Sequence, residues 1–138
     1  MLFSLETIHP LIVHFPIALL STGLFFDILA LILDREDFEH AGFWCMLMGI
    51  ISCFFSNFTG LMFFLTGGSL SDLPRFTHSL LAWGSTIIFI LLFWARIRLD
   101  VDFRYSTVKR WTYLSIHILA IGILFYGAHL GAKAAERI

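Results

Sequence analysis

Residues 8–33 read IHPLIVHFPIALLSTGLFFDILALIL, an apolar run whose one acidic residue is Asp27. A helix that rises ~1.5 Å per residue needs ~20 apolar residues to cross the ~30 Å hydrocarbon core of a bilayer. A transmembrane barrel strand would instead alternate apolar and polar residues over ~10 positions, and this run does not alternate. The stretch therefore predicts a membrane-spanning helix. We expect it to remain in the mature protein, because it has neither the basic start nor the small-residue cleavage site of a signal peptide.

Three more apolar stretches follow, each long enough to span a membrane: Ala41 to Leu65, Thr77 to Ala95 and Trp111 to Gly131. Charged or turn-forming residues separate them, namely Asp34 to Asp37, Gly67 to Ser69 with Pro74, and a charged segment from Arg96 to Arg110. The chain is 59% hydrophobic and 14% charged, which is too apolar for a soluble protein of 138 residues. We predict an all-α integral membrane protein, a four-transmembrane-helix bundle with up-down-up-down topology, in which residues 1–138 form one domain.

Basic residues are unevenly divided between the two sides of this predicted bundle. Six lie in the connections opposite the termini (Arg35, Arg96, Arg98, Arg104, Lys109 and Arg110), and three lie on the terminal side (Arg75, Lys133 and Arg137). Cytoplasmic loops carry the excess of Lys and Arg, so we expect both termini on the periplasmic or exterior side of a bacterial inner membrane. The net charge of -1 gives no basic patch, and nucleic-acid binding is not expected.

Four of the six histidines fall near ends of the predicted spans, and all four lie on the terminal side: His9, His14, His78 and His129. By helical rise, His14 lies ~9 Å inside its span and the others within ~3 Å of a span end, so one slab ~10 Å thick holds them all. Ionisable side chains at membrane depth usually face a bundle interior and have a role. The layer therefore predicts a cofactor, metal or proton site. The alternative is that these histidines are polar anchors at the membrane interface.

His9 and His14 are five residues apart, which separates them by ~140° around a helix. They cannot ligate one centre from the same face unless Pro10 or Pro16 distorts the turn. His14 lies deeper in the membrane than His9, so placing it there without a functional role would cost more free energy. We therefore predict His14, His78 and His129 as the ligands of a cofactor or metal ion, with His9 as a bystander.

Two further features accompany these ligands. Arg75 precedes His78 by three residues, where its cation would hold a haem propionate; snorkelling to the interface is the alternative. Gly127 and Gly131 form a small-xxx-small pair around His129 that lets a neighbouring helix or a flat cofactor approach the backbone, and plain helix packing is the alternative.

We interpret the remaining polar residues of the spans as structural. We expect Asp27 to form a hydrogen bond to another helix, with a proton path as the alternative. Asn57 and Thr59 are expected to form hydrogen bonds between helices. His117 has no histidine at a matching depth, so a second haem is not indicated.

Three motifs carry a resemblance to a known family: IHPLIVHFPIALL at residues 8–20, FDILA at 26–30 and GAHLG at 127–131. The chain is similar over its whole length to the small bacterial membrane proteins catalogued as domain of unknown function 2231. The resemblance implies four helices and maps the family's histidines onto His9, His14 and His129. The family has no established activity, but its domains are sometimes joined to c-type cytochrome modules, which implies a redox setting and a c-type cytochrome as a partner. Ala132 stands where a second glycine would be expected, which affects local packing only.

We therefore predict a membrane redox subunit that binds a haem b near its outer face and transfers electrons, with copper or another metal ion as the alternative cofactor. The alternative function is a cofactor-free accessory or scaffold subunit of a larger respiratory or photosynthetic complex. Its partners would be the lipid bilayer and other membrane subunits or further copies of itself. We do not expect the chain to be a catalyst on its own.

Overall fold

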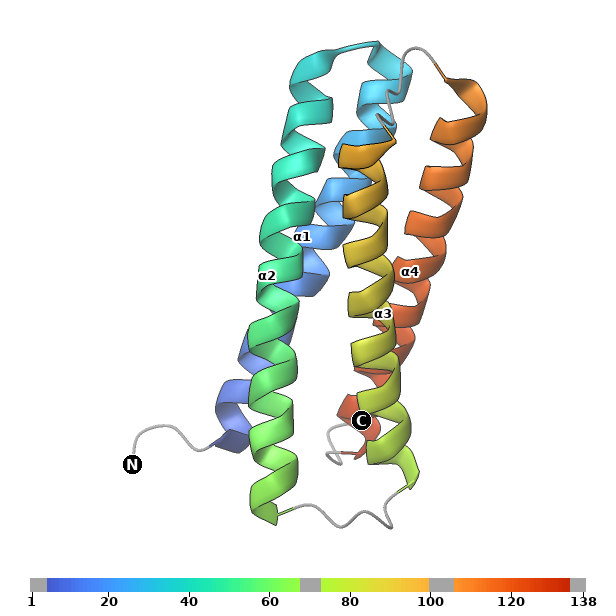
Figure 1. Ribbon diagram of the computed structural model, residues 1–138. Coiled ribbons are helices and arrows are strands. Elements are labelled where there is room, and N and C mark those ends of the chain that lie inside the picture. The colour runs from blue at the N-terminus through green and yellow to red at the C-terminus, as the bar shows by residue number, and fades with distance from the viewer. Residues whose placement is uncertain (1–4, 68–72, 100–105, 135–138) are drawn as a thin grey trace.

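The computed structural model describes residues 5–67, 73–99 and 106–134. Its four helices are α1 (Leu5–Leu33), α2 (Glu36–Gly67), α3 (Leu73–Arg98) and α4 (Thr107–Ala134). They run alternately up and down, and both termini lie at the end of the bundle where α2 is followed by α3 (Figure 1). The described ranges contain no strand. The predicted four-helix bundle is thus confirmed, and each helix has an apolar stretch long enough to cross a membrane.

The helices extend beyond the predicted spans. The second helix starts at Glu36 rather than near Ala41, because three acidic residues in its first turn favour the positive end of the helix dipole. The third helix continues to Arg98, so Arg96 belongs to α3 and not to a loop as predicted. Between α1 and α2 the chain reverses at Asp34, which adopts a φ of 52°, a left-handed conformation that Asp tolerates better than most residues.

α1 packs most closely on α2, and α3 packs most closely on α4. Glycines on α2 allow the first of these contacts. A Cβ atom on Gly49 would lie 2.7 Å from the Leu20 side chain, and one on Gly42 would collide with the carboxylate of Asp27. Small residues let helix backbones approach closely in membranes, where lipid is as apolar as a protein core. These two glycines therefore hold α2 against the buried face of α1.

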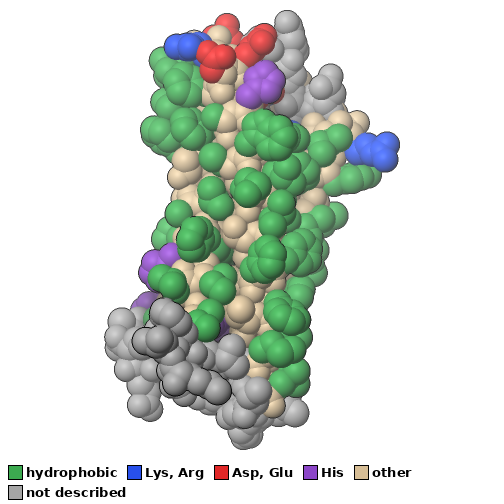
Figure 2. Space-filling model, turned by 90° about the vertical axis from the view of Figure 1, so that its left-hand side faces the viewer, with side chains coloured by type: hydrophobic (Ala, Val, Ile, Leu, Met, Phe, Trp, Pro, Cys, Tyr) green, Lys and Arg blue, Asp and Glu red, His purple; other side chains and the backbone are tan. Residues whose placement is uncertain are grey.

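The core runs along the bundle axis, and the outer surface is apolar. Leu20, Met46, Phe89 and Ala120, one from each helix, are fully buried. Large hydrophobic side chains cover the visible flank, and charged groups gather at the α1–α2 turn (Figure 2). An apolar flank is the surface expected of a protein surrounded by lipid.

Candidate functional site

The structure brings two of the four terminal-side histidines together. His9 of α1 and His78 of α3 have ring centroids 6.3 Å apart, with ring planes inclined by 74°. We call these two residues the histidine pair. His14 and His129 are exposed on the outside of the bundle. The His14 Nδ1 atom lies 2.7 Å from the carbonyl oxygen of Pro10 in the same helix. The predicted ligands His14, His78 and His129 therefore do not converge on one point.

Hydrogen bonds fix the tautomer of each ring in the histidine pair. The His78 Nδ1 atom lies 2.7 Å from the Gly127 carbonyl oxygen, which can only accept, so Nδ1–H donates. The His9 Nδ1 atom lies 3.0 Å from Thr59 Oγ1. The Thr59 hydroxyl donates its one proton to the Ser56 carbonyl oxygen, so Oγ1 accepts from His9. In the neutral state both rings therefore carry their lone pair on Nε2, which is the arrangement found in histidines that ligate metals.

Glycines lie against both rings of the histidine pair. A Cβ atom on Gly131 would lie 2.7 Å from His78 Cε1, and one on Gly60 would lie 3.0 Å from His9 Cε1. Gly127, the other member of the predicted small-xxx-small pair, contacts Leu81 instead. The close helix approach predicted at Gly127 and Gly131 is confirmed. Its effect is to let α3 place the His78 ring against the backbone of α4.

His9 was predicted as a bystander from its depth in the span, whereas the structure distinguishes His9 from His14 by helix face. His9 precedes Asp27 by 18 residues, ~5 complete turns, so both side chains lie on one face of α1. His14 is ~140° away from that face. Pro16 and Leu20, which lie between them, are buried on the same side as Asp27. The acidic residue of this span was therefore the signal that marked its inward face.

No group of three or more His, Cys, Asp or Glu side chains among the described residues could hold a metal ion. The histidine pair can supply two imidazole ligands and no carboxylate or thiolate. The side chain of Arg75, predicted to hold a propionate, lies outside the described part of the chain.

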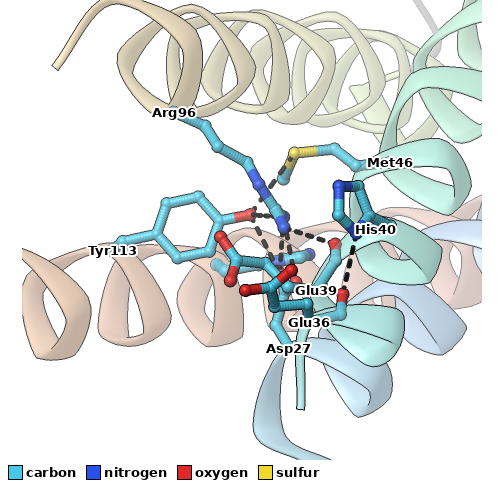
Figure 3. Close-up of polar contacts among 8 residues, drawn as sticks. Asp27, Glu36, Glu39, His40, Met46, Arg96 and Tyr113 are labelled. Carbon is cyan, nitrogen blue, oxygen red and sulfur yellow. Dashed lines mark hydrogen bonds and ion pairs between the residues drawn. The ribbon is translucent and has the colours of Figure 1, made fainter. Parts of the chain in front are cut away.

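A second polar site lies in the half of the bundle away from the termini (Figure 3). Arg96 of α3 places its Nη1 atom 2.9 and 3.0 Å from the two carboxylate oxygens of Asp27 of α1. Tyr113 of α4 donates its hydroxyl proton to Asp27 Oδ2 over 3.0 Å and accepts from the same Nη1 atom. Arg96 Nη2 donates to the Glu39 carbonyl oxygen of α2 over 2.8 Å. The contacts of one guanidinium therefore connect all four helices.

This ion pair is almost completely shielded from solvent. The side chains of Arg96 and Asp27 are 5% and 0% exposed. The predicted interhelical hydrogen bond of Asp27 is thus confirmed. Its partner was missed, because Arg96 was assigned to a loop. The spacing Phe89, Leu92, Arg96 gives the missing signal, since it continues the buried face of α3 by one more turn.

His117 of α4 completes what we call the buried polar cluster, made of Asp27, Arg96, Tyr113 and His117. It is fully buried, and its Nδ1 atom lies 3.7 Å from Asp27 Oδ2. Its ring meets Phe89 and Tyr113 edge to face, with centroid distances of 5.6 and 5.7 Å. Neither ring nitrogen has a hydrogen-bond partner within the described ranges. No role was predicted for His117, because no other histidine lies at a matching depth and the nearby carboxylate of Asp27 was not considered as its neighbour.

The two expected interhelical polar residues of α2 are confirmed. Asn57 donates to the Thr86 hydroxyl of α3 over 3.0 Å, and Thr59 accepts from His9 of α1. Hydrogen bonds between membrane helices are individually weak, with an average of ~0.6 kcal/mol. These contacts therefore orient the helices more than they stabilise them.

A family model described as "Predicted membrane protein (DUF2231)" matches residues 5–138. Neither the comparison with curated proteins nor that with solved structures finds a match. The chain belongs to this family of predicted membrane proteins.

Proposed function

For this member of the family, we propose the function of a membrane redox subunit that holds a haem b, or a single copper or other metal ion, between His9 and His78. The observation that carries the proposal is the convergence of two imidazoles whose Nδ1–H groups are held by acceptors on neighbouring helices. Such acceptors orient a ligating ring and increase the basicity of its Nε2 atom.

The separation of the rings supports a shared metal centre. A metal bound at Nε2 lies ~2 Å from that atom and hence ~3 Å from the ring centroid. The centroids of the His9 and His78 rings are 6.3 Å apart, so both rings would be near enough to hold one metal ion through their Nε2 atoms. Of the ligands predicted from sequence, His78 is retained in this pair, and His9 replaces His14 and His129.

The environment supports a haem over a bare ion. An apolar groove with a volume of about 290 Å³ lies between α2 and α3, lined by Phe54, Phe55, Phe58, Leu61 and Trp83. By sequence, Phe58 and Leu61 flank the Thr59 and Gly60 positions that contact His9. Apolar walls suit a porphyrin, and His9 and His78 would supply the ligands of its iron. In this arrangement Arg75, three residues before His78, would hold a propionate.

The test is the absorption spectrum of the purified protein, oxidised and then reduced, together with elemental analysis. We expect visible bands that sharpen on reduction if haem is present, or a stoichiometric metal if it is not. Replacing His9 or His78 with Ala should remove at least one ligand and change the spectrum and the cofactor content. His14→Ala and His129→Ala are the matched controls and should leave both unchanged.

The accessory or scaffold function is the competing outcome of the same test. A featureless spectrum without bound metal, in protein extracted gently from its native membrane, would refute the cofactor proposal and favour a scaffold. The apolar flank offers a surface for other subunits or for a second copy. The family resemblance adds a c-type cytochrome as a candidate redox partner, which would approach the histidine pair from the periplasmic side.

A further inference from the structure

The end of the bundle away from the chain termini carries opposite charges on its two sides. Both the α1–α2 turn and the connection from α3 to α4 lie at this end (Figure 1). Residues 34–40, around the turn, include four acidic residues and one basic residue, Arg35, which forms an ion pair with Asp37. Residues 96–110, which run from the end of α3 into α4, include five basic and two acidic residues. One side of this end is therefore acidic and the other is basic.

Two cations of the basic side are exposed, Arg98 in the last turn of α3 and Lys109 in the first turn of α4. The Lys109 ammonium group donates to the Leu99 carbonyl oxygen over 3.0 Å, so the start of α4 lies beside the end of α3. This bond uses one of the three ammonium protons. Within the described ranges, neither cation has an acidic partner. Two positive charges at adjoining helix ends are therefore available to an anion.

Exposed tryptophans mark the level of the membrane surface near these cations. Trp44 of α2, Trp94 of α3 and Trp111 of α4 are each more than half exposed. Each lies within five residues, or ~8 Å by helical rise, of a residue that contacts the Arg96 guanidinium or of Arg96 itself. Tryptophan is enriched at the headgroup level of membranes, because its ring is apolar and its N–H group is polar. The three rings therefore place the membrane surface at this end of the bundle.

The two cations lie just beyond the level of these rings. By helical rise, Arg98 is ~6 Å beyond Trp94, and Lys109 is ~3 Å beyond Trp111. Lipid phosphates occupy the polar layer next to the hydrocarbon, so both cations lie at the depth of phosphate groups. On the hydrocarbon side of them the flank is apolar, and Ile97 is exposed there to acyl chains.

We infer that the α3–α4 end binds the headgroup of an anionic phospholipid, whose phosphate is held by Arg98 and Lys109. A guanidinium can bond two phosphate oxygens at once, and an ammonium group adds a compact positive charge. The acidic α1–α2 turn repels the same headgroup, which confines binding to one side of the bundle. This inference is independent of the proposed cofactor, because the histidine pair lies at the opposite end.

The experiment is native mass spectrometry of the full-length protein, delipidated in a non-ionic detergent and titrated with phosphatidylglycerol or, separately, with phosphatidylcholine. A cation near an anionic lipid surface contributes about fivefold to the binding constant, so two cations give about 25-fold. We therefore expect the first phosphatidylglycerol to bind about 25-fold more tightly than phosphatidylcholine. Equal binding of the two lipids would overturn the inference. Glycerol 1-phosphate should not displace the lipid at equal concentration, and displacement would show a site for free phosphate instead.

Substitutions test which cations hold the headgroup. Arg98→Gln and Lys109→Gln should each reduce the preference for phosphatidylglycerol about fivefold, and the double variant should abolish it. The single variants keep the test valid if the double variant does not fold. Arg35→Gln is the matched control, because Arg35 is exposed at the same end but lies on the acidic side and pairs with Asp37. It should leave the preference unchanged. A double variant that keeps the preference, or an equal loss in Arg35→Gln, would contradict the assignment.

Discussion

Replacing Arg96 with Met should destabilise the bundle more than any other single change to a basic residue of the described chain. The substitution keeps the length of the side chain but leaves the buried Asp27 carboxylate without its cation. It also removes the donors to Tyr113 and to the Glu39 carbonyl oxygen. Removing one partner of a buried ion pair costs ~3–5 kcal/mol. Since native proteins are stable by ~5–15 kcal/mol, this loss is a large part of the total.

The assay is reversible unfolding in mixed detergent micelles, followed by circular dichroism. Arg98→Met is the matched control, because Arg98 is exposed two residues further along α3 and should change the unfolding free energy by less than ~0.5 kcal/mol. The double variant Asp27→Asn, Arg96→Met removes both charges and should recover most of the loss. If Arg96→Met is as stable as Arg98→Met, or if the double variant loses the sum of the single effects, the ion pair does not hold the helices together.

Two other predictions concern glycine contacts, and a third concerns orientation in the membrane. Gly42→Ala should lower the free energy of unfolding by ~1–3 kcal/mol in the same assay, because its Cβ atom would collide with the Asp27 carboxylate, which is held by an ion pair. Gly84→Ala is the control: a Cβ atom there meets open space, so this substitution should leave the protein as stable or make it more stable. Equal effects of the two substitutions would refute the packing argument. Gly131→Ala should displace the His78 ring and weaken its bond to the Gly127 carbonyl, seen as a change in the His78 Nδ1 signal by NMR; an unchanged signal would contradict the contact. A periplasm-specific reporter fused after Ile138 should be active and a cytoplasm-specific one inactive, and the reverse would disprove the orientation inferred from the basic residues.

The sequence by itself determined which segments span the membrane and the depth of each residue in it. The length of the apolar stretches sets the number of membrane-spanning helices. The helical rise per residue converts sequence position into depth in the membrane, so it was predictable that His9 and His78 lie at the same depth. Asp27, Asn57 and Thr59 were also recognised as interhelical hydrogen-bonding groups, because a polar side chain in a span needs a partner.

Only the tertiary structure decided which way each helix is rotated. The helices are apolar on nearly all sides, and lipid is as apolar as the core, so hydrophobicity drives insertion but does not choose an inward face. Polar contacts and small residues choose it instead: the carboxylate of Asp27 turns α1 so that His9 faces inward and His14 outward. Because of the same contact, Arg96 lies in α3 inside the bundle and not in the predicted loop. It also places His117 beside a carboxylate that is 90 residues away in the sequence.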